Sequence, residues 1–195
     1  MMAQRLILNL NQMRVTASYK SQKYKNLFGW THYGIDITNA DRNAPRIVYA
    51  NGKGKVTHVG EHPTAGKFIC ILYKDAEFVS GAIKDVVIRY FHLEKINVKS
   101  GTYVNKDTII AIYGNTGSST AAHLHVEVDL DAREKYANYT PQTSKSNNYL
   151  KAGVDSTVNP RAVLWCKKSA PDNQYVIDSG YNTVDLNEIN YQITE

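Results

Sequence analysis

The chain alternates strictly between apolar and polar side chains along one stretch, Ala122-His123-Leu124-His125-Val126-Glu127-Val128-Asp129-Leu130. Because successive side chains of a β-strand point to opposite faces, this pattern predicts a strand with one face in the core. The other face would carry His123, His125, Glu127 and Asp129, with the two imidazoles about 6.6 Å apart along the backbone. A lone pair of this kind fits either a solvated strand face or a site for a metal or substrate.

The same two-residue period recurs along most of the chain, whereas no long segment has the 3.6-residue period of a helix. Turn sequences such as Asn51-Gly52 and Gly114-Asn115-Thr116-Gly117 separate the segments. Asn159-Pro160 is typical of a helix start and predicts one short helix. The sequence therefore predicts an all-β fold, mainly an antiparallel sheet, with strands over 15–19, 35–38, 46–49, 54–59, 67–73, 86–92, 108–113 and 122–130.

Composition excludes several classes of protein. The 195 residues are 43% hydrophobic, which is enough for a sizeable core and excludes wholesale disorder. The longest apolar runs fall far short of the roughly 20 residues of a membrane span. Two cysteines, Cys70 and Cys166, exclude a disulfide scaffold and leave their pairing open.

Charge divides the chain into two parts. The net charge is +5, but five acidic residues and no lysine or arginine follow Lys168, so residues 1–168 carry a formal charge of +10. A basic body favours an anionic partner such as an acidic wall polymer or a nucleic acid, although no nucleic-acid-binding motif is present. We expect a body over 1–168, with an N-terminal segment and a surface insertion near 131–158, and an acidic C-terminal extension, 169–195. This extension is expected to pack against the body.

Two further segments carry side chains that could bind a metal. His32 and Asp36 would lie about 13 Å apart in a straight strand, so they could share one ion only if the chain hooked at Gly34. His92 ends another predicted strand, in which Tyr90 would share its face. Together with the His-x-His pair, these residues allow a three-ligand zinc site with an open fourth position. The spacing alone leaves open which histidines are ligands.

The order of these motifs resembles the lysostaphin/LytM-type zinc metallopeptidases. The resemblance covers about residues 15–165 and rests on the motifs His32-x-x-x-Asp36, Tyr90-x-His92-Leu93, Gly114-Asn115-Thr116-Gly117 and His123-Leu124-His125. It implies a compact β-fold whose groove holds one zinc ion, with His32, Asp36 and His125 as ligands. It also implies that His92 and His123 are the catalytic pair. Glu127, Tyr90 and Tyr33 are expected behind the ligands or along the groove wall.

This family cleaves peptide cross-links or stem peptides of bacterial peptidoglycan, so the resemblance implies a zinc-dependent endopeptidase that lyses cell walls. The alternative is a non-catalytic wall-binding or assembly module on the same fold. The N-terminal sequence does not resemble a signal peptide, so we expect a protein that acts on the cell wall as a phage tail protein or lysin, or otherwise a part of a secreted protein. The isolated domain is expected to be a monomer, on its own or within a larger phage or cell-wall assembly. The chain departs from the family pattern at Lys20, at Ala121 and at residues 105–107, where glycines are usual.

Overall fold

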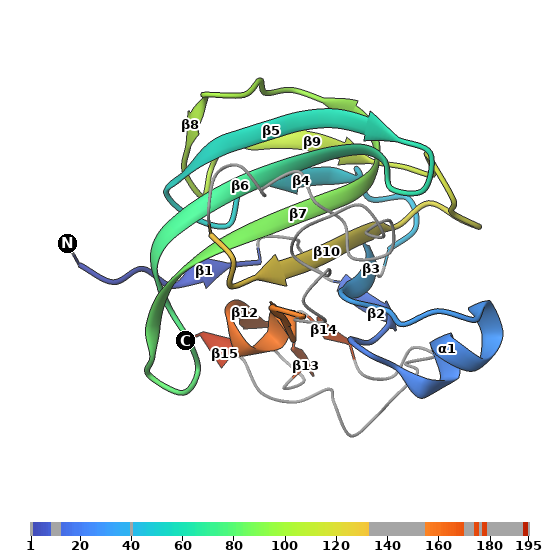
Figure 1. Ribbon diagram of the computed structural model, residues 1–195, viewed down its shortest axis with the longest axis horizontal. Coiled ribbons are helices and arrows are strands. Elements are labelled where there is room, and N and C mark those ends of the chain that lie inside the picture. The colour runs from blue at the N-terminus through green and yellow to red at the C-terminus, as the bar shows by residue number, and fades with distance from the viewer. Residues whose placement is uncertain are drawn as a thin grey trace.

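The fold consists of β-strands with little helix, as the computed structural model shows (Figure 1). The structure describes residues 2–8, 13–39, 41–132, 155–169, 174–175, 177–178 and 193–194. The predicted all-β fold class is confirmed. Its elements are β1 (Leu6–Ile7), β2 (Met13–Ala17), α1 (Gln22–Phe28), β3 (Ile35–Asn39), β4 (Ile47–Tyr49), β5 (Gly54–His62), β6 (Gly66–Glu77), β7 (Ile83–Ile96), β8 (Tyr103–Val104), β9 (Ile109–Tyr113), β10 (Leu124–Asp129), β11 (Thr157–Val158), the 3₁₀-helix η3 (Pro160–Ala162), β12 (Leu164–Ser169), β13 (Gln174–Tyr175), β14 (Ile177–Asp178) and β15 (Ile193–Thr194).

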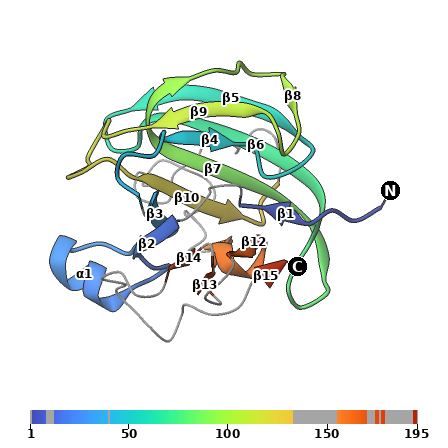
Figure 2. The same cartoon turned by 180° about the vertical axis from the view of Figure 1, so that it is seen from behind.

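The main sheet has the strand order β14-β2-β3-β10-β7-β6-β5-β8, and its pairs are antiparallel except β14 with β2. The long strand β7 also pairs with β9 near its end, and β9 pairs with β4. Figures 1 and 2 show β4 and β9 lying over one face of the β5–β6–β7 layer. The main core fills the space between them and includes Val48, Ile71, Ile88 and Ile110.

A β-bulge in β7 breaks the expected alternation next to His92. The pairing of β6 with β7 shifts between Lys67 and Ile69, and His92 has a left-handed φ of 59°. As a result, Tyr90 and Leu93 both face the main core although they are three residues apart. The prediction that Tyr90 and His92 share a face is therefore wrong, because a two-residue period cannot register an inserted residue.

The helical content differs from the prediction in two places. The helix α1 was not predicted; Ser21 caps its start and Gly29, with a left-handed φ of 82°, ends it. Seven residues are too few for a detectable helical period, and none of them is buried. The helix predicted at Asn159 forms only as η3, with the Asn159 side chain accepting a hydrogen bond from the backbone N–H of Arg161, and the chain then enters β12.

A smaller sheet joins the two ends of the described chain. β12 pairs with β1, β13 and β15, while β14 pairs with β2. Most of the predicted insertion near 131–158 and most of the predicted extension 169–195 lie outside the described residues. In the part that the structure describes, no helix is long and apolar enough to cross a membrane. Cys70 is a buried, free thiol.

Candidate metal centre and catalytic cleft

Three side chains meet at one point on the strand β10. His32 Nε2 lies 3.0 Å from both Asp36 Oδ1 and His125 Nδ1, and His125 Nδ1 lies 2.7 Å from Asp36 Oδ1. All three residues are buried, and they form a group whose ligand atoms lie within 4.8 Å of one another. Two imidazoles and one carboxylate form a donor set that zinc prefers when one coordination position is left open. The residues present therefore fit a catalytic zinc ion.

Strand pairing and one bend in the chain bring these three side chains together. His125 is the direct cross-strand partner of Asp36, because β10 pairs antiparallel with β3. The chain bends at Gly34 just before β3 begins, which places His32 over the same point. Gly34 packs so closely against β10 that an added Cβ atom would lie 2.3 Å from the carbonyl oxygen of Val126 and 2.8 Å from His125 Nε2. The hook expected at Gly34 is present, and the absence of a side chain there permits the close approach.

The far nitrogen of each ligand histidine makes its own hydrogen bond. His32 Nδ1 donates to the backbone carbonyl of Ser18 at 2.8 Å, and His125 Nε2 donates to Glu127 Oε1 at 3.1 Å. Such bonds fix the tautomer and ring orientation of metal-binding histidines. Glu127 is fully buried against His125, so it is not a solvated rim carboxylate.

The close contact of Asp36 with the histidines shifts the pKa values of this group. Burial disfavours the ionised carboxylate of Asp36, but the charge of His32 and hydrogen bonds from the histidines hold its pKa well below the ordinary value. Burial likewise opposes the charged form of His125, but hydrogen bonds to Asp36 and Glu127 raise its pKa to about 9. In the metal-free protein the ring therefore carries a proton on each nitrogen, and one of these would be displaced when a metal binds.

His92 and His123 form a second pair beside the ligands, with ring centroids 4.8 Å apart. His92 Nδ1 donates to the carbonyl of Thr116 at 2.8 Å, which leaves Nε2 unprotonated in the neutral ring. Burial and the neighbouring charges of His125 and His123 lower the pKa of His92 to about 4. His92 is therefore neutral at pH 7.

His123 has the opposite electrostatic setting. It lies just before β10, in an isolated bridge with Gly114, and its Nδ1 donates to the carbonyl of Ala121 at 2.8 Å. Its Nε2 lies 3.5 Å from Asp36 Oδ1. Burial lowers the pKa of His123, but the hydrogen bond and charge of Asp36 outweigh burial and raise it overall. The two histidines thus favour different protonation states in the same place.

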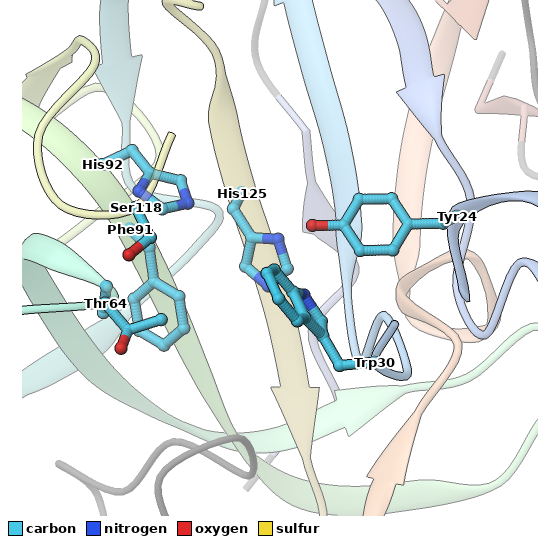
Figure 3. Close-up of a pocket in the computed structure, with 8 residues that line it drawn as sticks. Tyr24, Trp30, Thr64, Phe91, His92, Ser118 and His125 are labelled. Atoms are coloured by element: carbon cyan, nitrogen blue, oxygen red, sulfur yellow. The ribbon is translucent and has the colours of Figure 1, made fainter. Parts of the chain in front are cut away.

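A cleft opens above this centre (Figure 3). His125 lies at its middle, with His92 and Ser118 on one side and Tyr24 and Trp30 on the other. The lining residues are Tyr24, Trp30, Thr64, Ala65, Phe91, His92, Ser118 and His125. Phe91 stacks on His125 with a centroid separation of 5.3 Å and an interplanar angle of 2°, and Tyr24 stacks on His32 at 4.3 Å.

The structure brings some of the residues predicted around the site together and places others elsewhere. His32, Asp36, His92, His123, His125 and Glu127 come together. Tyr90 lies on the other face of β7, fully buried, with its hydroxyl bonded to Tyr73 and Asn51, so its role is packing and not lining the groove. Tyr33 is half-buried and is not among the residues that line the cleft.

Sequence reasoning missed Tyr24, Trp30 and Phe91 as cleft residues. A two-residue period puts Phe91 and His92 on opposite faces of β7, whereas the bulge lets both line the cleft. Tyr24 lies in the unpredicted helix α1 and Trp30 follows it, and the only local signals for that helix are the Ser21 cap and the glycine that follows Phe28.

Comparison with known proteins agrees with this geometry. The family model for Peptidase family M23 matches residues 30–138, which is more than half of the chain. The chain belongs to this family. The resemblance to lysostaphin/LytM-type metallopeptidases is thereby confirmed.

Individual M23 relatives cover part of the chain. The peptidoglycan DD-endopeptidase ShyB of Vibrio cholerae is 41% identical over 97 residues, covering 50% of this chain and 20% of ShyB. Lysostaphin of Staphylococcus simulans is 34% identical over 137 residues, covering 68% of this chain and 25% of lysostaphin. The structure of that antimicrobial peptidase superposes with a TM-score of 0.51 and 27% identity over 87% of this chain and 64% of the lysostaphin chain. The chain thus spans about a quarter or less of the length of these two curated relatives.

Proposed function

We propose that this M23 protein is a zinc-dependent endopeptidase that hydrolyses cross-links or stem peptides of bacterial peptidoglycan. The observation that carries the proposal is the pairing of a His-Asp-His group with two further histidines of opposite electrostatic character in one cleft. The similarity to a peptidoglycan DD-endopeptidase and to lysostaphin supports the choice of substrate.

His32, Asp36 and His125 would hold the metal. A zinc ion there supplies a Lewis acid that polarises a peptide carbonyl and makes water a stronger nucleophile near neutral pH. Beside this group, His92 and His123 are the side chains suited to move protons, and the hydrogen bonds of each ring indicate whether it accepts or donates one.

His92 is suited to accept a proton. Its Nδ1 is fixed as a donor to Thr116, so the unprotonated Nε2 is the nitrogen available to take a proton from the attacking water. The left-handed backbone at His92 and the bulge hold the ring on the cleft side of β7, which is where the water has to be oriented.

His123 is suited to donate. Its Nδ1 is bonded to the Ala121 carbonyl, and Asp36 raises its pKa, which favours the form in which Nε2 also carries a proton. A protonated Nε2 stabilises negative charge on the carbonyl oxygen and can pass its proton to the departing amine. Substrate hydrolysis therefore needs both histidines, in different protonation states.

The other interpretation of the sequence, a non-catalytic wall-binding or assembly module, requires no such pair. A purely structural metal site is closed by four protein ligands, whereas the described residues provide three converging donors and two separate imidazoles. We therefore favour the enzyme.

Site variants provide the test. His92→Ala and His123→Ala should each retain one zinc ion per chain, measured by elemental mass spectrometry, and lose cleavage of defined cross-linked muropeptides. His32→Ala should lose the metal and the activity together. Retention of cleavage by His92→Ala and His123→Ala would refute the enzymatic mechanism, and loss of zinc from His123→Ala would make it a ligand.

A further inference from the structure

Helix α1 and the turn after it expose an unusual amount of apolar surface. Leu27, Phe28 and Trp30 are 67%, 39% and 48% exposed, and the helix has no buried residue. Large apolar side chains grouped together on a surface are characteristic of binding sites, because exposing them to water has an energetic cost. Helix α1 and Phe28 also precede the range that the M23 family model matches.

The aromatic rings are held in a defined arrangement. Tyr24 and Phe28 are one helical turn apart with centroids 4.6 Å apart, and Phe28 and Trp30 have centroids 6.2 Å apart with planes inclined by 31°. The left-handed conformation of Gly29 ends the helix and turns the chain between Phe28 and Trp30. We call Phe28 and Trp30 the aromatic platform.

The platform is continuous with the cleft. Tyr24 stacks on the ligand His32 and contacts Phe28, while Trp30 itself lines the cleft. Figure 3 shows Tyr24 and Trp30 on the side of His125 that lies opposite His92. A polymer whose peptide bond lies over His125 could therefore extend onto the platform.

The polar groups around the platform are suited to sugars. The helix contains Gln22, Lys23, Lys25 and Asn26 and no acidic residue. A hexosamine ring has an apolar C–H face that stacks on an aromatic ring, and its hydroxyl and acetamide groups accept hydrogen bonds from ammonium and amide donors. Recognition of a peptide by strand addition would need a free strand edge, and a helix end followed by a turn offers no such edge.

We infer that the aromatic platform of Phe28 and Trp30 is a subsite for an N-acetylhexosamine ring of the peptidoglycan glycan strand, next to the cleft that takes the peptide. The inference rests on the proposed function for its choice of polymer. It assigns to this chain a contact with the sugar part of the wall in addition to the scissile peptide.

The test uses the two tryptophans as reporter and internal control. Trp165 is half-buried beneath Arg5 and its indole N–H donates to the carbonyl of Glu77, away from the platform. Glycan strands freed of peptide by an amidase are titrated into the ¹⁵N-labelled full chain. The Trp30 indole signal should shift in a saturable way and the Trp165 signal should stay in place.

Variants then assign the effect to the platform. Phe28→Ala should weaken glycan binding by about tenfold in the Trp30 titration, the loss expected from one aromatic contact. Trp30→Ala removes the reporter signal, so its binding is measured by isothermal titration calorimetry beside the original chain and should weaken by the same factor. Tyr103→Ala removes an aromatic ring that is 79% exposed on β8 and should leave binding unchanged. An unchanged Trp165 signal in each variant shows that the fold is intact.

Three outcomes would overturn the inference. These are an unshifted Trp30 signal, equal weakening by Tyr103→Ala, and a Trp30 shift produced only by sugar-free stem peptide or by lipid vesicles. Binding to peptide-free glycan does not depend on hydrolysis, so the experiment tests the sugar subsite separately from the proposed endopeptidase activity. A chain that binds glycan through Trp30 but never cleaves muropeptides refutes the proposed function alone, and the reverse result refutes the platform alone.

Discussion

Replacing Gly34 with alanine tests how the sheet builds the metal centre. The added Cβ would lie 2.3 Å from the carbonyl oxygen of Val126, about 1 Å closer than ordinary van der Waals contact. The obstructing atoms belong to the backbone of β10 and to the ring of His125, so no flexible side chain can relieve the clash. Strands β3 and β10 would have to separate by about 1 Å, and this moves Asp36 relative to its cross-strand partner His125.

A separation of the two strands should weaken zinc binding, because a metal site tolerates only small displacements of its ligands. Ligand positions must hold to within about 0.2 Å, so a displacement of about 1 Å should weaken zinc binding by about a hundredfold. Overpacking should also lower the free energy of unfolding of the metal-free protein by about 1–3 kcal/mol. Competition with a chromophoric chelator measures the affinity, and chemical denaturation measures the stability.

Gly60→Ala is the matched control. Gly60 also lies in a strand, β5, but an added Cβ there would meet only side-chain atoms of Phe68 and His58, none closer than 3.0 Å. We expect this variant to bind zinc like the original chain. If Gly34→Ala kept the original zinc affinity and stability, the close approach of β3 to β10 would not be what positions the ligands.

Four further predictions concern the site and its surroundings. Glu127→Gln keeps an acceptor for His125 Nε2 but removes its charge, so the zinc Kd should rise by about 10- to 100-fold in chelator competition; an unchanged Kd would show that this carboxylate has no influence on the metal. The Thr116 hydroxyl donates to the carbonyl of Leu93 and accepts from the backbone N–H of Lys67 at the β7 bulge. Thr116→Val removes this hydroxyl and should lower kcat and reduce the free energy of unfolding by about 1–3 kcal/mol, whereas Thr116→Ser should keep the original kcat and stability. Because the pKa of His125 is raised to about 9, zinc must displace a proton at lower pH, and the Kd should rise about tenfold for each unit between pH 8 and pH 6; a Kd independent of pH would contradict this. The same raised pKa stabilises the metal-free fold fully below about pH 6.5, and thermal melts without zinc should show this contribution lost as the pH rises through about 9.

The sequence was most informative where local pattern and tertiary structure agree. Alternation from Leu124 to Asp129 predicted the strand that carries His125. The order of motifs singled out His32, Asp36 and His125 as expected ligands, and the structure brings these three side chains together. Spacing could not show that Asp36 and His125 are cross-strand partners, because strand pairing is set by the whole sheet.

The failures have local physical causes. Tyr90 continues the core-facing alternation of Val86 and Ile88, and the bulge that follows it turns His92 to the cleft side, since one inserted residue reverses the side chains after it. Lys20, noted as a departure from a usual glycine, adopts a left-handed φ of 51° and pairs with Asp155 at 2.6 Å, so the position retains the glycine-like backbone with a different side chain. Helix α1 was missed because its only signals were one cap and one glycine.

The most direct test of the proposed function is to identify the bond that the chain breaks in purified peptidoglycan. The zinc-loaded protein should release new amino groups and no new reducing sugar, a chelator should stop the release, and added zinc should restore it. His123→Ala, loaded with zinc, should release none. Amino-group release that persists without metal, or release of reducing sugar only, would contradict the assignment of this cleft as a zinc endopeptidase site.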